Sequence, residues 1–215
     1  MLSFTEIEDI LKSGDFSKLK DQFESELIDV KSQIYDFSNT SKDNKYELCK
    51  DVSAFANNKG GFILLGVAGQ KLQGKPHEKI VSVVGINVAD INQQQYVQHL
   101  ENGIYPKLAS ECSLEFSKLD GKDVFYIKVN ENSNNKPYLV RKDNYFSYII
   151  RTETHGLQEP LDRIHEIMRH GLHHELYISG MDKKLNELLE VVRKEQIVNQ
   201  PVMKSSNIEE LLKEL

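Results

Sequence analysis

The sequence lacks an excess of positive charge, a long apolar run and a metal-binding cysteine pattern, and each absence narrows the class of protein. Its 215 residues carry 27 Lys and Arg against 33 Asp and Glu, a net charge of -6. Any contact with a polyanion must therefore come from a local basic patch. No apolar stretch approaches the length that spans a bilayer. Cys49 and Cys112 lie far apart, and we expect both to be small buried groups in a reducing cell.

The first fifteen residues are acidic and helical in pattern, unlike a basic and apolar signal peptide, so we expect a cytoplasmic protein with no membrane partner. Ser3 or Thr5 caps this first helix and Gly14 ends it. The whole pattern predicts an α+β fold, with a mixed, largely antiparallel sheet flanked by helices and a C-terminal helical tail. We expect a lead-in over 1–20, a domain over 21–157 and a tail over 158–215.

The segment 53–67, SAFANNKGGFILLGV, is the most informative part of the chain. Apolar residues at Leu48, Val52 and Phe55 share one face of a helix predicted over 45–57. Gly60 and Gly61 follow, and glycine permits a positive φ or a close backbone approach. The apolar run 62–67 then predicts a strand that is buried on both faces. A polyanion backbone can lie against exposed N–H groups at such a turn.

Weaker signals place the remaining elements of the domain. Residues 26–31 predict an edge strand, 68–77 a loop and 79–84 a strand, and Asp90 is the expected cap of the next helix. Asp120-Gly121 predicts a hairpin turn between the strands 114–116 and 124–129. The β-branched and aromatic residues of 145–151 predict a further strand.

Three motifs in order resemble the AlbA-like domain of Schlafen proteins, a family of nucleic-acid-binding domains. They are ESELIDVK at 24–31, ANNKGGFILLGV at 56–67, and NSNNKPY at 132–138 followed by Ile150-Arg151-Thr152. The resemblance implies that this protein binds RNA or single-stranded DNA, in regulation or anti-phage defence. The contacts that we predict are Lys31, Asn57, Lys59, the backbone of Gly60 and Gly61, Lys136, Arg141 and Arg151.

The resemblance also raises a nuclease as the alternative function. In Schlafen nucleases two carboxylates of the first motif join a third after the glycine-valine pair, and such clusters bind Mg²⁺ or Mn²⁺. Glu24 and Asp29 match the first two positions as catalytic and metal-binding candidates. Ala68 and Gly69 occupy the third position and cannot ligate a metal, so a third acid would have to come from Asp51 or Glu153.

Two further patterns are weighed and set aside. Residues 69–75 fit G-x-x-x-x-G-K, but Pro76 replaces the Ser or Thr that holds Mg²⁺ and a strand follows instead of a helix, so a hairpin loop is the better interpretation. His170 and His174 lie one helical turn apart, with Glu166 a turn earlier. No further ligand completes a zinc site, and a solvated helix end explains them better.

Basic and aromatic residues alternate late in the domain. Lys136, Arg141 and Arg151 are interleaved with Tyr138 and Phe146, a pattern that suits unpaired bases, although the aromatic rings of a strand can equally face the core. In the tail, the apolar stripe 185–192 packs on the domain or forms a homodimer through the C-terminal helices. A protein-interaction module is the second alternative function.

Overall fold

The computed structural model describes residues 2–37, 42–131, 135–142, 145–151 and 156–158. All of them belong to the first of the two units into which the chain divides, Met1–Met168. The predicted tail, with its histidines and its dimerisation stripe, lies outside the described residues, as does Glu153. Within the described part, no helix has both the length and the apolar character that a bilayer-spanning segment needs.

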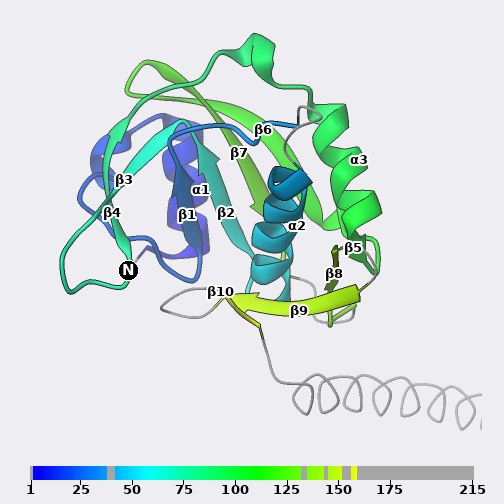
Figure 1. The fold of residues 1–215 in the computed structure, drawn as a ribbon. Helices are drawn as coiled ribbons and strands as arrows, with labels where there is room; N and C mark the ends of the chain where they lie inside the picture. Colours follow the sequence, from blue (N-terminus) through cyan, green and yellow to red (C-terminus); the bar gives the residue numbers. More distant parts are fainter. Residues whose placement is uncertain (1, 38–41, 132–134, 143–144, 152–155, 159–215) are drawn as a thin grey trace, which may run out of the picture. The chain divides into compact units, whose positions relative to one another are not determined.

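The described residues form an α+β fold, with a mixed and mostly antiparallel set of strands and three α-helices, as predicted for this part of the chain (Figure 1). The helices are α1 (Phe4–Ser13), α2 (Lys42–Asn57) and α3 (Gln93–Gly103). The strands are β1 (Ile28–Lys31), β2 (Gly61–Leu65), β3 (Val67–Lys71), β4 (Glu78–Val83), β5 (Ile104–Tyr105), β6 (Cys112–Leu119), β7 (Lys122–Val129), β8 (Leu139–Lys142), β9 (Tyr145–Arg151) and β10 (Gly156–Gln158). Single 3₁₀ turns, η1 to η3, lie at Phe16–Lys18, Val88–Asp90 and Ala109–Glu111.

The described strands form three sheets. The first has the order β1-β2-β7-β6, in which β1 is a parallel edge strand and the other pairs are antiparallel. The second, β10-β9-β8-β5, is antiparallel throughout, and the third is the β3-β4 hairpin. Strand β2 therefore has a neighbour on each side, which confirms the predicted central strand.

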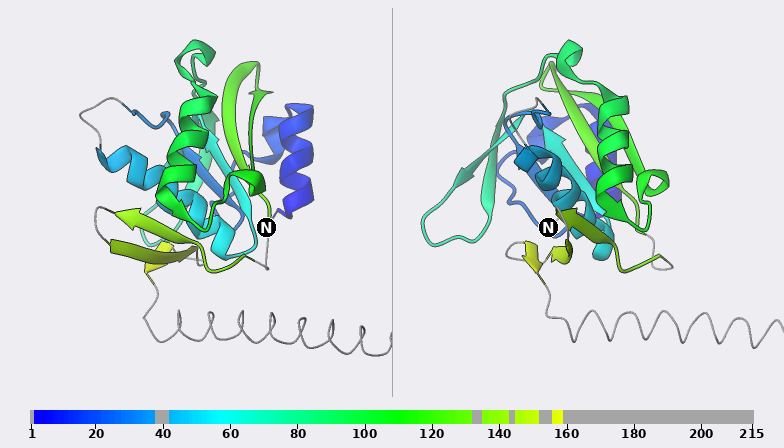
Figure 2. Two further views of the ribbon diagram at one scale, coloured as in Figure 1. Left: turned by 90° about the vertical axis from the view of Figure 1, so that its right-hand side faces the viewer. Right: turned by 45° about the vertical axis from the view of Figure 1, so that its right-hand side comes forward.

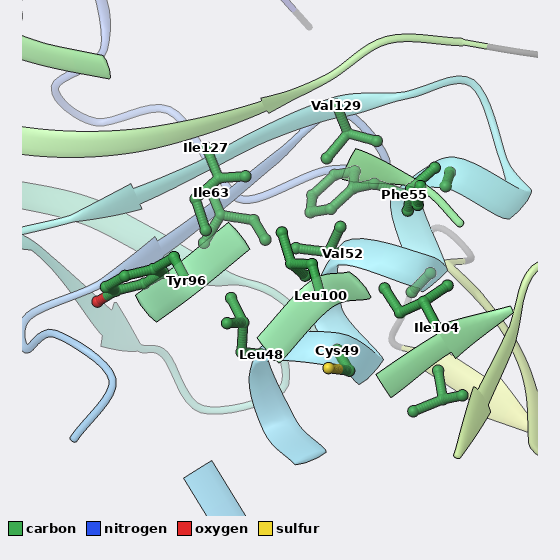
Figure 3. Close-up of a cluster of buried hydrophobic side chains, with 14 of the residues drawn as sticks. Leu48, Cys49, Val52, Phe55, Ile63, Tyr96, Leu100, Ile104, Ile127 and Val129 are labelled. Carbon is green, nitrogen blue, oxygen red and sulfur yellow. The ribbon is translucent and has the colours of Figure 1, made fainter. Parts of the chain in front are cut away.

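The first sheet is buried on both faces because its central strands alternate apolar side chains between two cores. Phe62 and Leu64 pack with α1, whereas Ile63 and Leu65 pack with α2 and α3. Figure 2 shows α1 on one side of this sheet and α2 with α3 on the other. The close-up shows Leu48, Val52 and Phe55 of α2 pointing into the larger core (Figure 3).

The ends of several elements follow their local sequence. Ser3 caps α1 in a capping box with Glu6, and Gly14 ends the helix at φ 77°. Asp120 and Gly121 have φ of 50° and 74°, which fits the predicted β6-β7 hairpin.

Some predicted boundaries are wrong. Helix α2 begins at Lys42, three residues early, and Asn92 caps α3 where Asp90 was expected. The predicted strand 62–67 breaks at Gly66, whose φ of 94° turns the chain, so that a new strand, β3, starts at Val67 and continues through the first residues of the expected loop 68–77. Strand β8 was not anticipated.

Candidate nucleic-acid interface

The paired glycines allow close approach within the chain itself. A Cβ at Gly61 would overlap the ring of Phe55 and lie 2.7 Å from the carbonyl oxygen of Leu27. A Cβ at Gly60 would overlap the carbonyl oxygen of Val129, and the N–H of Gly60 donates to Phe55. Both glycines are buried. The backbone expected to meet a polyanion is therefore enclosed by the end of α2 and by β7.

Asn57, the last residue of α2, joins this turn to the second sheet. Its Oδ1 accepts the N–H of Tyr138 at 2.7 Å, and its Nδ2 donates to the carbonyls of Tyr138 and Ile149, each at 2.8 Å. Only 5% of the residue is exposed. A contact between Asn57 and nucleic acid would require these bonds to break, so the amide serves the fold in this structure.

Arg151 crosses from the end of β9 to β1. Its Nη1 lies 3.0 Å from Oδ1 of Asp29, its Nε donates to the carbonyl of Ser25 at 2.9 Å, and its Nη2 donates to that of Ile28. The guanidinium carbon lies 4.6 Å from the ring centroid of Phe55. All three predicted motifs therefore meet at Arg151 and Asn57. With 12% of its side chain exposed, Arg151 has little surface left for a phosphate.

Lys31 lies between two carboxylates. Its Nζ is 3.1 Å from Oδ2 of Asp29 and 2.9 Å from Oδ2 of Asp51, to which the hydroxyl of Tyr35 also donates. Burial opposes the charge on Lys31, but the two carboxylates outweigh that effect and raise its pKa. Burial raises the pKa of Asp51, and Lys31 offsets only part of the increase. The predicted phosphate contact of Lys31 competes with two ion pairs.

Glu24 lies beside this network. Its Oε1 accepts the N–H of Val30 at 2.9 Å. Burial, and then the negative charge of Asp29, raise the pKa of Glu24 to about 7, although Val30 and Arg151 favour its charged form. Glu78 adds a further raising effect. Glu24 and Asp29, the two acids of the first motif, are thus close enough to interact.

Glu78 supplies an acid that the sequence did not identify. A Cβ built at Gly69 would overlap Oε2 of Glu78 and lie 3.3 Å from Cγ2 of Val30. The carboxylate of Glu78 therefore occupies the space of a side chain at the family's third acidic position. The predicted hairpin loop could have indicated this acid. Strand β4 folds back on β3 and pairs Glu78 with Lys71, which lies two residues beyond Gly69.

These acids do not fit a divalent metal in their present arrangement. Both oxygens of Asp29 face cations, and Oδ2 of Asp51 faces Lys31 and Tyr35. Oδ2 of Asp29 has no well-aligned hydrogen bond within the described residues, but it lies in the ion pair with Lys31. Across the described part of the chain, no three His, Cys, Asp or Glu residues are grouped as a metal site requires. A Mg²⁺ or Mn²⁺ ion would first have to displace Lys31 or Arg151.

A polar cavity of about 370 Å³ opens next to the acids. Its lining includes Lys31, Asn44, Glu47, Gly69 and Glu78. Carboxylates and a lysine share this lining, so the cavity has no single sign of charge and does not by itself favour a phosphate.

The remaining predicted cations differ in exposure. The side chain of Lys59 is 61% exposed and its Nζ pairs with Glu26 at 2.9 Å. Lys136 is only 18% exposed, because its Nζ donates to the carbonyl of Asn58. Arg141 is exposed on β8, opposite Phe146 of β9. Lys59 and Arg141 are thus the two predicted cations that lie mainly in solvent.

A family model described as Schlafen, AlbA_2 matches residues 24–158. No curated protein matches the chain significantly. Among solved structures, the chain is similar to the DIP2311 protein of Corynebacterium diphtheriae, with 15% identity and a TM-score of 0.48 over 77% of this chain and 28% of that one. It is also similar to the N-terminal domain of a RecG-related protein of Nitrosomonas europaea, with 20% identity and a TM-score of 0.43 over 75% of this chain and 95% of that one. The chain thus spans less than a third of DIP2311.

Proposed function

The chain belongs to the Schlafen AlbA_2 family, and from this premise we propose that it binds nucleic acid, with RNA or single-stranded DNA preferred over duplex DNA. The family is generally tied to nucleic-acid-related proteins. A role in regulation or anti-phage defence follows from the same resemblance and is part of the proposal.

The observation that carries the proposal is the distribution of charge between the two large sheets. The strands of the second sheet contain no acid, and they carry Arg141 and Lys142 in addition to Arg151, whose charge is already paired with Asp29. The strands of the first sheet contain four lysines and three acids, namely Lys31, Lys118, Lys122, Lys128, Asp29, Glu115 and Asp123. A local surface of positive charge is what a protein of net charge -6 needs in order to hold phosphates.

The predicted contacts divide into two roles in this proposal. Lys59 and Arg141 present exposed positive charge, and Lys142 lies at the end of β8 with its Nζ 4.6 Å from the ring of Tyr46. Asn57, Gly60, Gly61, Lys31 and Arg151 hold the framework through internal contacts. Lys136 joins the second group because its ammonium group binds the turn at Asn58.

The salt dependence of binding tests the proposal. A labelled 12-nucleotide single-stranded RNA is titrated with protein at several salt concentrations, in parallel with the same RNA annealed to its complement. Release of counterions gives a slope of log K against log salt of about -0.7 for each phosphate contacted in a single strand, so three cations give about -2. The triple substitution of Lys59, Arg141 and Lys142 to Gln should flatten the slope. A slope near zero for the unaltered protein would contradict the proposal.

The protein-interaction alternative makes the opposite prediction. It expects no salt-sensitive retention of the protein on RNA or heparin, and it expects self-association that is lost when the residues after Pro160 are deleted. Sedimentation of the full chain and of the shortened chain, each with and without the RNA, separates the two functions.

A further inference from the structure

The second sheet has one face on α2 and one face turned away from it. Ile104, Val140 and Ile149 lie in the core beneath α2. Side chains alternate along a strand, and residues paired across strands share a face. The opposite face therefore carries the intervening residues, which are Tyr105 of β5, Leu139 and Arg141 of β8, and Phe146 and Tyr148 of β9.

Two aromatic rings on this outer face are open to solvent. Tyr105 is 66% exposed and Phe146 is 55% exposed, the highest values for large apolar side chains among the described residues. Leu139 between them is half-buried, and Tyr148 is 2% exposed, so the open area ends there. Exposed aromatic rings on one face of a sheet provide flat surfaces on which the faces of unpaired bases can stack.

The strand register fixes how the two rings are spaced. Tyr105 pairs with Leu139, and Phe146 pairs with Arg141, while β8 lies between β5 and β9. The two rings are therefore two strands and two residues apart, which is about 12 Å from the spacings of a sheet. Each ring has room for a flat group of its own, and the Arg141 side chain lies between them on the same face.

We propose that this aromatic face, defined by Tyr105, Arg141 and Phe146, binds single-stranded nucleic acid by stacking unpaired bases on the two rings. The proposal rests on the proposed function and adds the place and the manner of binding. Base faces stack on aromatic side chains with little sequence preference, and arginine contacts phosphates or stacks in turn. A duplex offers no free base faces along its length, so the aromatic face selects single strands.

Charge favours a nucleic acid over a protein as the occupant. An apolar protein surface would complement Tyr105 and Phe146, but it would have to accommodate the exposed cation Arg141 on the same face. No carboxylate lies on any strand of this sheet to hold a basic partner. Lys107, two residues after Tyr105, adds a further exposed cation. The face thus combines apolar rings with positive charge, as single-strand binding requires.

Tryptophan fluorescence offers a direct test, because the natural chain contains no Trp. Phe146→Trp, Tyr105→Trp and the control Phe23→Trp each introduce a single reporter. Phe23 is 38% exposed and lies beside β4, away from the proposed face. Oligo(U) of 12 nucleotides should quench the first two reporters in a saturable way and leave the third unchanged.

Affinity measurements with the full chain separate stacking from charge. Phe146→Ala and Tyr105→Ala should each weaken single-stranded RNA binding about tenfold, within the range found for loss of one stacked base. Their slope of log K against log salt should stay that of the unaltered protein, because no phosphate contact is removed. Phe23→Ala serves as the matched control, and urea unfolding confirms that all variants remain folded.

The outcomes distinguish this inference from the proposed function. If the unaltered protein binds neither single-stranded nor double-stranded RNA, the proposed function and this inference both fail. If it binds RNA but Phe146→Ala and Tyr105→Ala bind equally well and the tryptophan reporters are not quenched, the aromatic face is overturned while the function stands. If the alanine variants instead change the sedimentation of the protein and leave RNA binding intact, the face is a protein contact, which also overturns the inference.

Discussion

Arg151 donates to Asp29 across 3.0 Å although the two residues are separated by 122 positions in the sequence. The same guanidinium holds two carbonyl oxygens near β1 and lies over the ring of Phe55. One side chain from the last motif therefore fastens the first motif and the helix of the second. The three motifs, which are separate in the sequence, are thus joined in the folded protein by the contacts of this one side chain.

Removing the Arg151 side chain should destabilise the protein strongly. Arg151→Met leaves the carboxylate of Asp29 without its closest cation, and loss of one partner of a buried pair costs about 3–5 kcal/mol of unfolding free energy. Arg151→Lys should recover little, since an ammonium group cannot make the three directed bonds of the guanidinium. Urea unfolding monitored by circular dichroism measures both. The double variant with Asp29→Asn should be more stable than Arg151→Met alone, and equal stability would contradict the pairing.

Glu24 should make the protein less stable as the pH rises from about 4.5 to about 7. The folded-state pKa of about 7 exceeds the ordinary value of 4.5, so the unfolded chain loses its proton first, and its free energy falls relative to that of the folded protein in that window. Glu24→Gln can still accept from Val30 but does not ionise. The variant should match the natural protein at pH 4 and exceed its stability at pH 8, by on the order of 1 kcal/mol after screening by water. An identical pH profile for both proteins would refute this assignment.

Gly61→Ala should cost more stability than Gly74→Ala. At Gly61 the added methyl meets the Phe55 ring and a carbonyl, and overpacking of this kind costs about 1–3 kcal/mol beyond the strain of a positive φ. At Gly74, φ is 75° but no atom lies within 4 Å of the added methyl, so only a strain of about 1 kcal/mol remains. The two midpoints of urea unfolding give the comparison. Equal losses of stability in the two variants would contradict this prediction, because they would mean that the Phe55 ring moves aside at little cost.

Incubation with Mg²⁺ or Mn²⁺ separates binding from cleavage. Because Lys31 and Arg151 already neutralise Asp29, we expect tRNA and single-stranded DNA to remain intact while their gel bands shift. Glu24→Ala and Glu78→Ala are the matched variants. Cleavage by the natural protein that Glu24→Ala abolishes would establish a nuclease, and loss of that cleavage in Glu78→Ala would assign Glu78 the role of the absent third acid.

Local patterns were sufficient to predict much of the fold. The spacing of Leu48, Val52 and Phe55 identified α2, and the run after Gly61 identified a strand whose side chains enter two cores. Asp120-Gly121 identified the β6-β7 hairpin. In each case a short stretch carries the physical cause, which is a periodic apolar face or a residue that tolerates positive φ.

The contacts within the site were harder to predict from the sequence, because they join strands that are far apart in the chain. The motifs brought Glu24, Asp29, Asn57 and Arg151 to attention, but no local pattern shows that the last two use their polar groups inside the chain. Glu78 depends on the register of a hairpin with a bulge at Ala68 and Gly69. The openness of Tyr105 and Phe146 depends on which face α2 covers, and that is settled only when the sheets assemble.

The contacts that Arg151 makes with β1 also limit where this protein can be shortened. A fragment cut before β9 would lose the Arg151 side chain that contacts β1, and Ile149 of the larger core, even though it would keep every residue of the first sheet. Such a fragment should fold poorly when it is expressed, and a synthetic peptide spanning 145–158 should restore its folding by binding in trans.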